Sequence, residues 1–223
     1  MQKKTIKFQA VLFGTFNFPA DPDTTFKLMT IFAPLGFMPQ VMNVQDPIAG
    51  LTSQRLGLTK GSEMQIQFSP DRIDFTAPMP SMDIDIFLND VVDYVGKLER
   101  GSLQFNRVAL VIDALFEELS QTESEALRGK LLPQSGINSV EWVARWVTPL
   151  SIHNEQYNAC FEAVTATGLM MIINGRMHPL SGIKTMHDVS TTPSNTAHRF
   201  NVDNLQETLY GISKIILDRD NIF

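Results

Sequence analysis

Residues 81–100 and 202–216 each carry apolar side chains along a single helical stripe. This spacing predicts two long helices, each with one face that must be buried. Each helix follows several short segments in which apolar and polar residues alternate, as they do in half-buried strands. A helix in that position covers the apolar face of the sheet that precedes it. The sequence therefore predicts an α+β fold in which two long helices cover a curved, mostly antiparallel sheet.

The order of the predicted elements occurs twice along the chain. The first half contains a strand at 6–18, a short helix that ends before Pro34, strands at 37–45, 52–59, 63–69 and 72–76, and the first long helix. The second half contains a strand at 105–117, a short helix that ends near Pro133, strands at 140–146, 157–163, 169–173 and 183–189, and the closing helix. We therefore predict an internal duplication of a strand–helix–four strands–helix unit. Its halves, at 1–103 and 104–223, are expected to pack as one pseudo-symmetric globule.

A local similarity between the two halves supports the predicted duplication. Residues 74–78 lead into the first long helix, and residues 188–193 lead into the second. In both segments a strand ends on a hydroxyl-bearing residue, and a loop marked by proline follows. Together with the repeated order of elements, this arrangement resembles the duplicated TATA-binding-protein-like, or helix-grip, class of folds. Related halves would most simply share one curved sheet about a pseudo-twofold axis.

Three further segments carry a resemblance to a known family. They are the strand and turn at 68–73, the strand at 106–110, and residues 188–191, which precede Arg199 and Phe200. On these segments the chain resembles a sporadically distributed, uncharacterised family of bacterial proteins of about this length. That family has no assigned reaction and no assigned catalytic residues, so the resemblance implies no residue roles. It implies a bacterial protein whose partner would be a neighbouring enzyme, toxin or defence component.

The charge balance and the cysteine content restrict the class of protein. The chain has 18 basic and 24 acidic residues and a net charge of −6, which disfavours a nucleic-acid partner. Its single cysteine, Cys160, excludes an intrachain disulfide framework and is typical of a reducing compartment. The first apolar run is broken by Gln9, Gly14 and Asn17, so it predicts neither a signal peptide nor a membrane span. We expect a cytoplasmic protein with no membrane partner.

Histidines gather in the second half of the chain. His178, His187 and His198 lie in one region together with Asp188, and imidazole with carboxylate is a reasonable ligand set for zinc or another transition metal. The spacings between these histidines match no closed metal motif, and His178 and His198 occupy loop-like positions. The alternative interpretation is therefore a set of surface histidines.

Five residues are candidates for recognition of a partner. Arg199, Phe200 and Arg176 lie in predicted loops, and arginine and aromatic side chains are favoured anchors at interfaces. The alternative for these three is a helix-cap contact and a tight hairpin turn. Trp142 and Trp146 are expected on one face of a strand. Core packing explains the two tryptophans most simply, and a flat ligand or protein partner on an uncovered sheet face is the alternative.

No motif for catalysis or for a cofactor emerges from the remaining residues. Cys160 has no basic neighbour in sequence, so it is expected to pack as a small apolar side chain. Asp90 and Asp93 share the polar face of the helix at 81–100, which is typical of a solvated surface. The glycines form no phosphate-binding loop. We therefore expect no cofactor.

The leading functional interpretation is a non-catalytic protein-binding or assembly module that serves as an accessory component of a bacterial multi-protein system. Such a module would dock another protein, or itself, through a strand edge or an uncovered sheet face. A small-ligand carrier or sensor is the first alternative, with a cavity between sheet and helices lined by Met64, Phe68, Phe87 and Val91. A metal-dependent hydrolase that uses the histidines is the second.

Overall fold

The computed structural model describes residues 2–45, 52–99, 103–117, 119–132, 141–152, 155–166, 169–173, 176–180, 182–194 and 196–220. In the first half, the strands are β1 (Gln2–Gly14), β2 (Met38–Gln45), β3 (Thr52–Lys60), β4 (Met64–Phe68) and β5 (Arg72–Pro78). In the second half, they are β6 (Phe105–Glu117), β7 (Val143–Ile152), β8 (Glu155–Thr165), β9 (Leu169–Ile173), β10 (Arg176–Leu180) and β11 (Ile183–Thr191). The α-helices are α1 (Pro22–Phe32), α2 (Ile84–Glu99), α3 (Gln121–Leu131) and α4 (Val202–Asp220).

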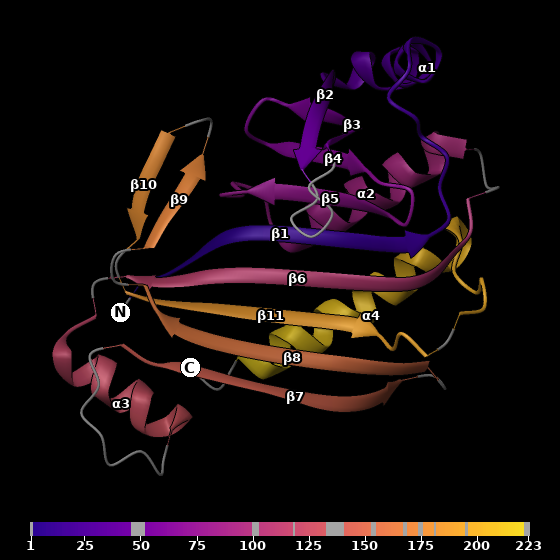
Figure 1. Ribbon diagram of the computed structural model, residues 1–223. Helices are drawn as coiled ribbons and strands as arrows, with labels where there is room; N and C mark the ends of the chain where they lie inside the picture. Colours follow the sequence, from indigo (N-terminus) through magenta and orange to yellow (C-terminus); the bar gives the residue numbers. More distant parts are fainter. Residues whose placement is uncertain are drawn as a thin grey trace.

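Nine strands form one antiparallel sheet in the order β2-β3-β4-β5-β1-β6-β11-β8-β7 (Figure 1). The long strands β1 and β6 pair along most of their length at the middle of this order. The other strands of the first half lie on the β1 side, and β11, β8 and β7 lie on the β6 side. β9 and β10 pair with each other in a separate two-stranded ribbon. The fold is therefore α+β and its main sheet is antiparallel, as predicted.

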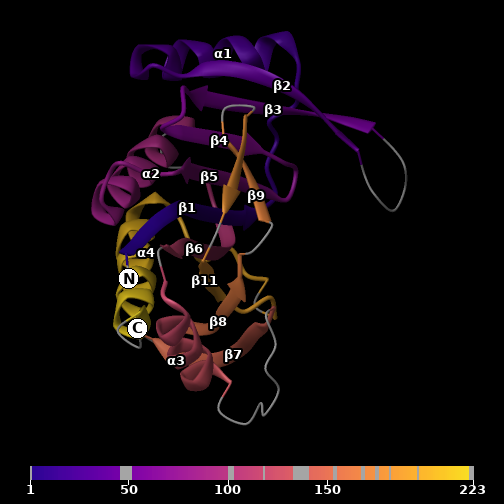
Figure 2. The ribbon, with the colours of Figure 1, turned by 90° about the vertical axis from the view of Figure 1, so that its left-hand side faces the viewer.

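Three helices, α2, α3 and α4, pack on one face of this sheet, and α1 lies at its β2 edge (Figure 2). α2 and α4 lie side by side on that face (Figure 2), and α3 covers it near β7 and β8. Local sequence determines where the shorter helices begin. The Asp21 carboxylate accepts a hydrogen bond of 2.7 Å from the Thr24 amide at the start of α1, and Ser120 with Glu123 forms a capping box at the start of α3. Among the described residues no helix packs on the opposite face of the sheet, which we call the uncovered face.

Two apolar clusters hold the helices against the sheet. The main core joins α1, α2 and α4 to the strands, and it contains buried residues such as Phe75, Phe87 and Leu209. A smaller cluster, the α3 core, packs Leu127 and Leu131 against the second half of the sheet. In the described part of the chain, none of the helices combines the length and the apolar character that a membrane span requires.

The structure corrects two details of the predicted strands. The first strand was predicted at 6–18 but runs from Gln2 to Gly14. Phe16 lies beyond its end and is still buried, because the Phe16 amide bonds to the Pro70 carbonyl and holds the loop against the core. After its short helix the second half has five strands, not the predicted four, since the region around Pro179 forms β10. Proline is tolerated there because, among the described residues, β10 has a partner strand on only one side.

Candidate functional site

Strand β11 separates two of the predicted metal ligands. His187 and Asp188 are consecutive on β11, so their side chains point to opposite faces of the sheet. The His187 ring is buried on the helix-covered face, edge-on to Phe161 at a centroid distance of 4.9 Å. His198 is exposed in the segment before α4, and the side chain of His178 lies outside the described residues. Within the described residues, no three His, Cys, Asp or Glu side chains are grouped to hold a metal ion.

Arg199 and Phe200 join the segment before α4 to the sheet. The Arg199 guanidinium makes two hydrogen bonds of 2.7 Å to the Glu155 carboxylate on β8. It also donates to the Asn106 carbonyl on β6 and lies 4.7 Å from the centre of the Phe200 ring. The Phe200 ring is buried and stacks on Phe105. Both side chains therefore hold the fold together, which leaves little of either for an external partner.

The remaining recognition candidates lie apart from these two. Trp142 is buried in the α3 core, while Arg176 begins β10 with a side chain outside the described residues. Trp146 lies on the same helix-covered face as Trp142, since it is opposite Phe161 in the β7–β8 register. The pair therefore cannot bind a ligand on the uncovered face, because both side chains lie on the opposite, helix-covered face. The predicted cavity residues are all buried in the main core: Met64, Phe68, Phe87 and Val91.

Trp146 and His187 share a cavity on the helix-covered face. Its volume is about 250 Å³, and its other described lining residues are Thr148, Phe161 and Arg219. The sequence offered both residues as separate candidates, one for recognition and one for metal binding. Only the pairing of β7, β8 and β11 brings them together.

Carboxylates on the uncovered face form ion pairs with basic side chains. Asp113 on β6 is buried, and its Oδ2 atom lies 3.2 Å from Lys7 Nζ on β1 and 3.1 Å from Lys184 Nζ on β11. Asp113 therefore links three adjacent strands at the centre of the sheet. Asp74 on β5 is paired in the same way with Arg72 at 2.9 Å and accepts a bond from Gln9 at 3.0 Å.

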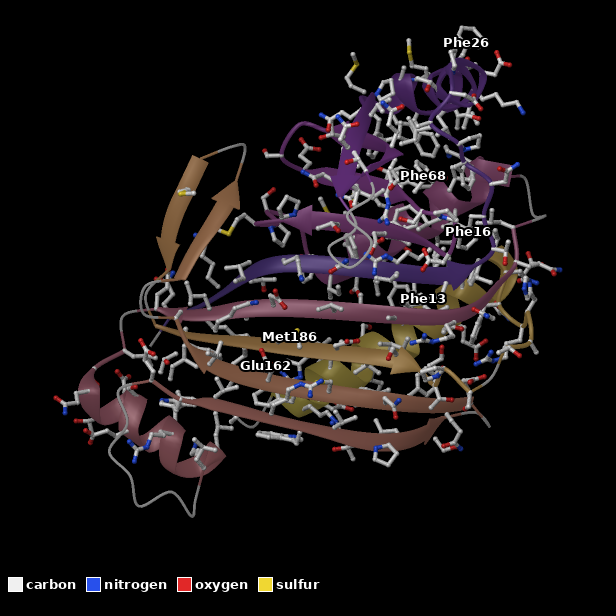
Figure 3. All side chains as sticks on the ribbon, in the orientation of Figure 1. Phe13, Phe16, Phe26, Phe68, Glu162 and Met186 are labelled. Carbon is white, nitrogen blue, oxygen red and sulfur yellow. The ribbon has the colours of Figure 1, made fainter. Side chains whose placement is uncertain are left out.

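Among the carboxylates on this face, Asp188 is the one whose negative charge is least balanced by hydrogen bonds and basic side chains. On the same face Met186, two positions earlier on β11, pairs with Glu162 of β8 (Figure 3). The Oδ1 atom of Asp188 is buried and has no hydrogen-bond partner among the described residues. Burial raises the pKa of the Asp188 carboxyl above its ordinary value of 3.8, and the positive charge of Arg107 opposes that rise. Ionisation of Asp188 therefore destabilises the folded state.

Replacing Asp188 with asparagine should raise the stability of the protein at pH 7. The raised pKa means that the folded state binds this proton more tightly than the unfolded chain. The stability that protonated Asp188 contributes is fully present below pH 3.8 and is lost as the pH rises through the folded-state pKa. Urea unfolding of both proteins from pH 3.5 to pH 7 measures this difference. We expect the gain of Asp188→Asn to shrink as the pH falls, and a gain independent of pH would contradict this account.

The distal part of the β2–β3 hairpin extends beyond the rest of the sheet. β4 pairs only with Gly57–Lys60 of β3, whereas Val41–Gln45 of β2 pairs with 52–56 of β3. This distal segment, which we call the ribbon, therefore has two strands and no third one among the described residues. Figure 2 shows that it projects on the side opposite α2 and α4. Two isolated strands are at best marginally stable in water, so the ribbon is a candidate for docking.

Exposed apolar side chains accompany the ribbon on β2 and α1. Met38 and Val41 of β2 are 64% and 52% exposed, and Phe26 and Met29 of α1 are 71% and 42% exposed. α1 packs against β2, and Phe26 points away from the sheet (Figure 3). We call these four residues the β2–α1 apolar surface; Met38 and Val41 are three positions apart on a regular strand, so they border the β2 edge from opposite faces. β2 contains no charged residue, although edge strands are commonly protected by charges.

Comparison of the chain with known proteins gives no relative: no protein-family model matches it, and no curated protein matches it.

Proposed function

We propose that this protein is an assembly module that pairs with a second copy of itself along the edge strand β2. In this arrangement β2 of each copy continues the sheet of the other, and the two β2–α1 apolar surfaces meet across the join. The observation that carries the proposal is an uncharged edge strand that combines exposed apolar side chains with a projecting ribbon. An accessory role in a larger bacterial assembly is the wider form of this proposal, and it rests on the family resemblance alone.

A second copy suits this edge better than a strongly charged partner. An antiparallel pair of identical strands about a twofold axis is self-complementary: where residue i of one copy meets residue j of the other, j of the first copy also meets i of the second. Like charges would repel in such a pair, but β2 has none. α1 contributes one acidic and one basic residue, Asp23 and Lys27. The net charge of −6 therefore does not accumulate on this surface.

The opposite edge of the sheet, β7, is less suited to the same role. β7 carries Arg145, whose Nε atom lies 3.5 Å from the Glu162 carboxylate on β8. It also contains Pro149 in its interior, opposite Asn158, whereas the proline of β2, Pro39, is the second residue of that strand and lies opposite Leu58. Charges and prolines within an edge strand both oppose the addition of another strand. Val143 and Val147 are exposed there, which makes β7 a suitable control.

Replacing Val41 with lysine is expected to convert a dimer into a monomer. The substitution places two positive charges close to the twofold axis, and like charges in an interface cost several kcal/mol. The dissociation constant should rise by a factor of more than about 100. Sedimentation equilibrium over a concentration series measures this constant.

The matched control for Val41→Lys is Val143→Lys on β7. The two valines are 52% and 59% exposed, so the change in solvation is similar at both edges. We expect the wild type and Val143→Lys to dimerise equally, whereas Val41→Lys should not. A wild-type protein that stays monomeric at high concentration would contradict the proposal, and so would a Val41→Lys variant that dimerises normally.

The proposal includes an internal duplication with halves at 1–103 and 104–223. From the central pair outwards, the sheet order is β1-β5-β4-β3-β2 on one side and β6-β11-β8-β7 on the other. Each half thus has its first strand at the centre and its last sheet strand beside it. α2 follows β5 and α4 follows β11, and both cover the same face. The β9–β10 pair belongs to the second half alone. In this view β2 and β7 are the outer edges, and only β2 keeps the docking role.

A further inference from the structure

The cavity between Trp146 and His187 lies where two parts of the core meet. Val189 of β11 belongs to the main core and Ile183 belongs to the α3 core, and His187 lies between them on the same face of the strand. Phe161, on the adjacent strand β8, belongs to the α3 core. Arg219 reaches the cavity from the last turn of α4. The cavity therefore lies between the part of the sheet that α4 covers and the part that α3 covers.

Aromatic rings form the walls of this cavity. The Trp146 and Phe161 rings are in contact, with centroids 4.5 Å apart and planes inclined by 35°. Phe161 is buried, whereas Trp146 is 37% exposed and forms the accessible side. A planar ring can pack against the free part of the indole without displacing the buried Phe161. The volume of about 250 Å³ is below the range of about 300–1,000 Å³ typical of drug-sized ligands. One or two fused rings are therefore the suitable size.

The polar side chains that line the cavity are basic or neutral. They are the imidazole of His187, the guanidinium of Arg219 and the hydroxyl of Thr148, and none of the described lining residues is acidic. The guanidinium is a charged donor suited to binding a carboxylate. The imidazole of His187 is buried at the same site and adds a second polar group. A group with a negative charge is therefore the complementary ligand.

We propose that this cavity binds a small planar organic anion, with its ring packed against Trp146 and its carboxylate directed to Arg219. The site lies on the helix-covered face between β7, β8, β11 and α4. β2 lies at the other end of the strand order. The ligand site is thus independent of the proposed pairing along β2, and the Val41→Lys variant should bind the same ligand with unchanged affinity.

Isothermal titration calorimetry with 2-naphthoate tests the proposal, with 2-naphthamide as the uncharged analogue. We expect saturable binding of one naphthoate per chain and binding of the amide that is at least about tenfold weaker, because the charged hydrogen bond to Arg219 is lost. Arg219→Gln should weaken naphthoate binding by a similar factor. Arg145→Gln, a basic residue outside the lining of the cavity, is the matched control and should leave the affinity unchanged.

Three results would overturn the proposal. Absence of saturable naphthoate binding would exclude the site for this class of ligand. Equal affinity for the carboxylate and the amide would remove the role assigned to the negative charge. Equal losses of affinity in Arg219→Gln and Arg145→Gln would show that the interaction is with the charge of the whole protein and not with the cavity. Thermal unfolding of each variant without ligand verifies that the substitutions leave the fold intact.

Discussion

Replacing Gly182 with alanine is expected to lower the free energy of unfolding by more than about 3 kcal/mol. Gly182 immediately precedes β11 and has a φ angle of +135°, a conformation that side chains with a Cβ atom rarely adopt. A Cβ atom at this position would lie 2.0 Å from the carbonyl oxygen of Phe116 on β6. That oxygen belongs to the backbone of a central strand, so it cannot move without disturbing the pairing of β6 and β11. Urea unfolding followed by circular dichroism measures the loss.

Gly129→Ala in α3 is the matched control for Gly182→Ala. A Cβ atom at Gly129 would meet no atom within 4 Å, and alanine is the better helix former. We therefore expect Gly129→Ala to raise the stability by about 0.5–1 kcal/mol. Equal and small effects of the two substitutions would contradict the close approach of Gly182 to β6.

Replacing Arg199 with alanine is expected to cost about 3 kcal/mol of stability. The guanidinium joins β8 to the segment before α4 through its two bonds of 2.7 Å to Glu155, and both side chains are only 18% exposed. Removal of the arginine leaves the Glu155 carboxylate largely shielded from water with no opposite charge. It also removes the contact with the Phe200 ring. The midpoint and slope of urea unfolding give the free energy.

Arg145→Ala provides the comparison for Arg199→Ala. Its guanidinium also pairs with a glutamate on β8, but at 3.5 Å and with 59% of the arginine side chain exposed. Exposed ion pairs contribute little to stability, so Arg145→Ala should change the free energy of unfolding by no more than about 0.5–1 kcal/mol. If Arg199→Ala is as mild as Arg145→Ala, the guanidinium of Arg199 does not hold the segment as described.

Most elements of the first half were predictable because their signals are local. Alternation in β4 and β5 and the stripe of α2 each reflect burial of one face, and that burial appears directly in the order of apolar residues. β1 was misplaced at its end because Phe16 continues the alternation while the backbone has already left the sheet. β10 was missed because proline and histidine are typical of loops.

The candidate sites depend on contacts that no local pattern encodes. The sequence singled out Trp146 and His187, but their shared cavity requires β7, β8 and β11 to pair in one register. Asp188 was grouped with His187 because the two are adjacent in sequence, and adjacency on a strand places them on opposite faces. The proposed docking edge could not be assigned to β2 from the sequence, since the order of strands in the sheet decides which strand lacks a second neighbour.

Pulsed electron paramagnetic resonance with a spin label at Asn43 of β2 tests the proposed pairing most directly. The native cysteine, Cys160, is buried, so Asn43→Cys provides the labelling site and the wild-type protein is the labelling control. In an antiparallel pair of eight-residue β2 strands, equivalent residues lie within about 26 Å along the strand, since each residue extends about 3.3 Å. We therefore predict a distance distribution centred below about 30 Å. In a dimer joined through β7, the full widths of both nine-stranded sheets would lie between the two labels. Because neighbouring strands are about 4.8 Å apart, the labels would then be separated by roughly 80 Å. The absence of any coupling below about 40 Å would contradict the pairing along β2.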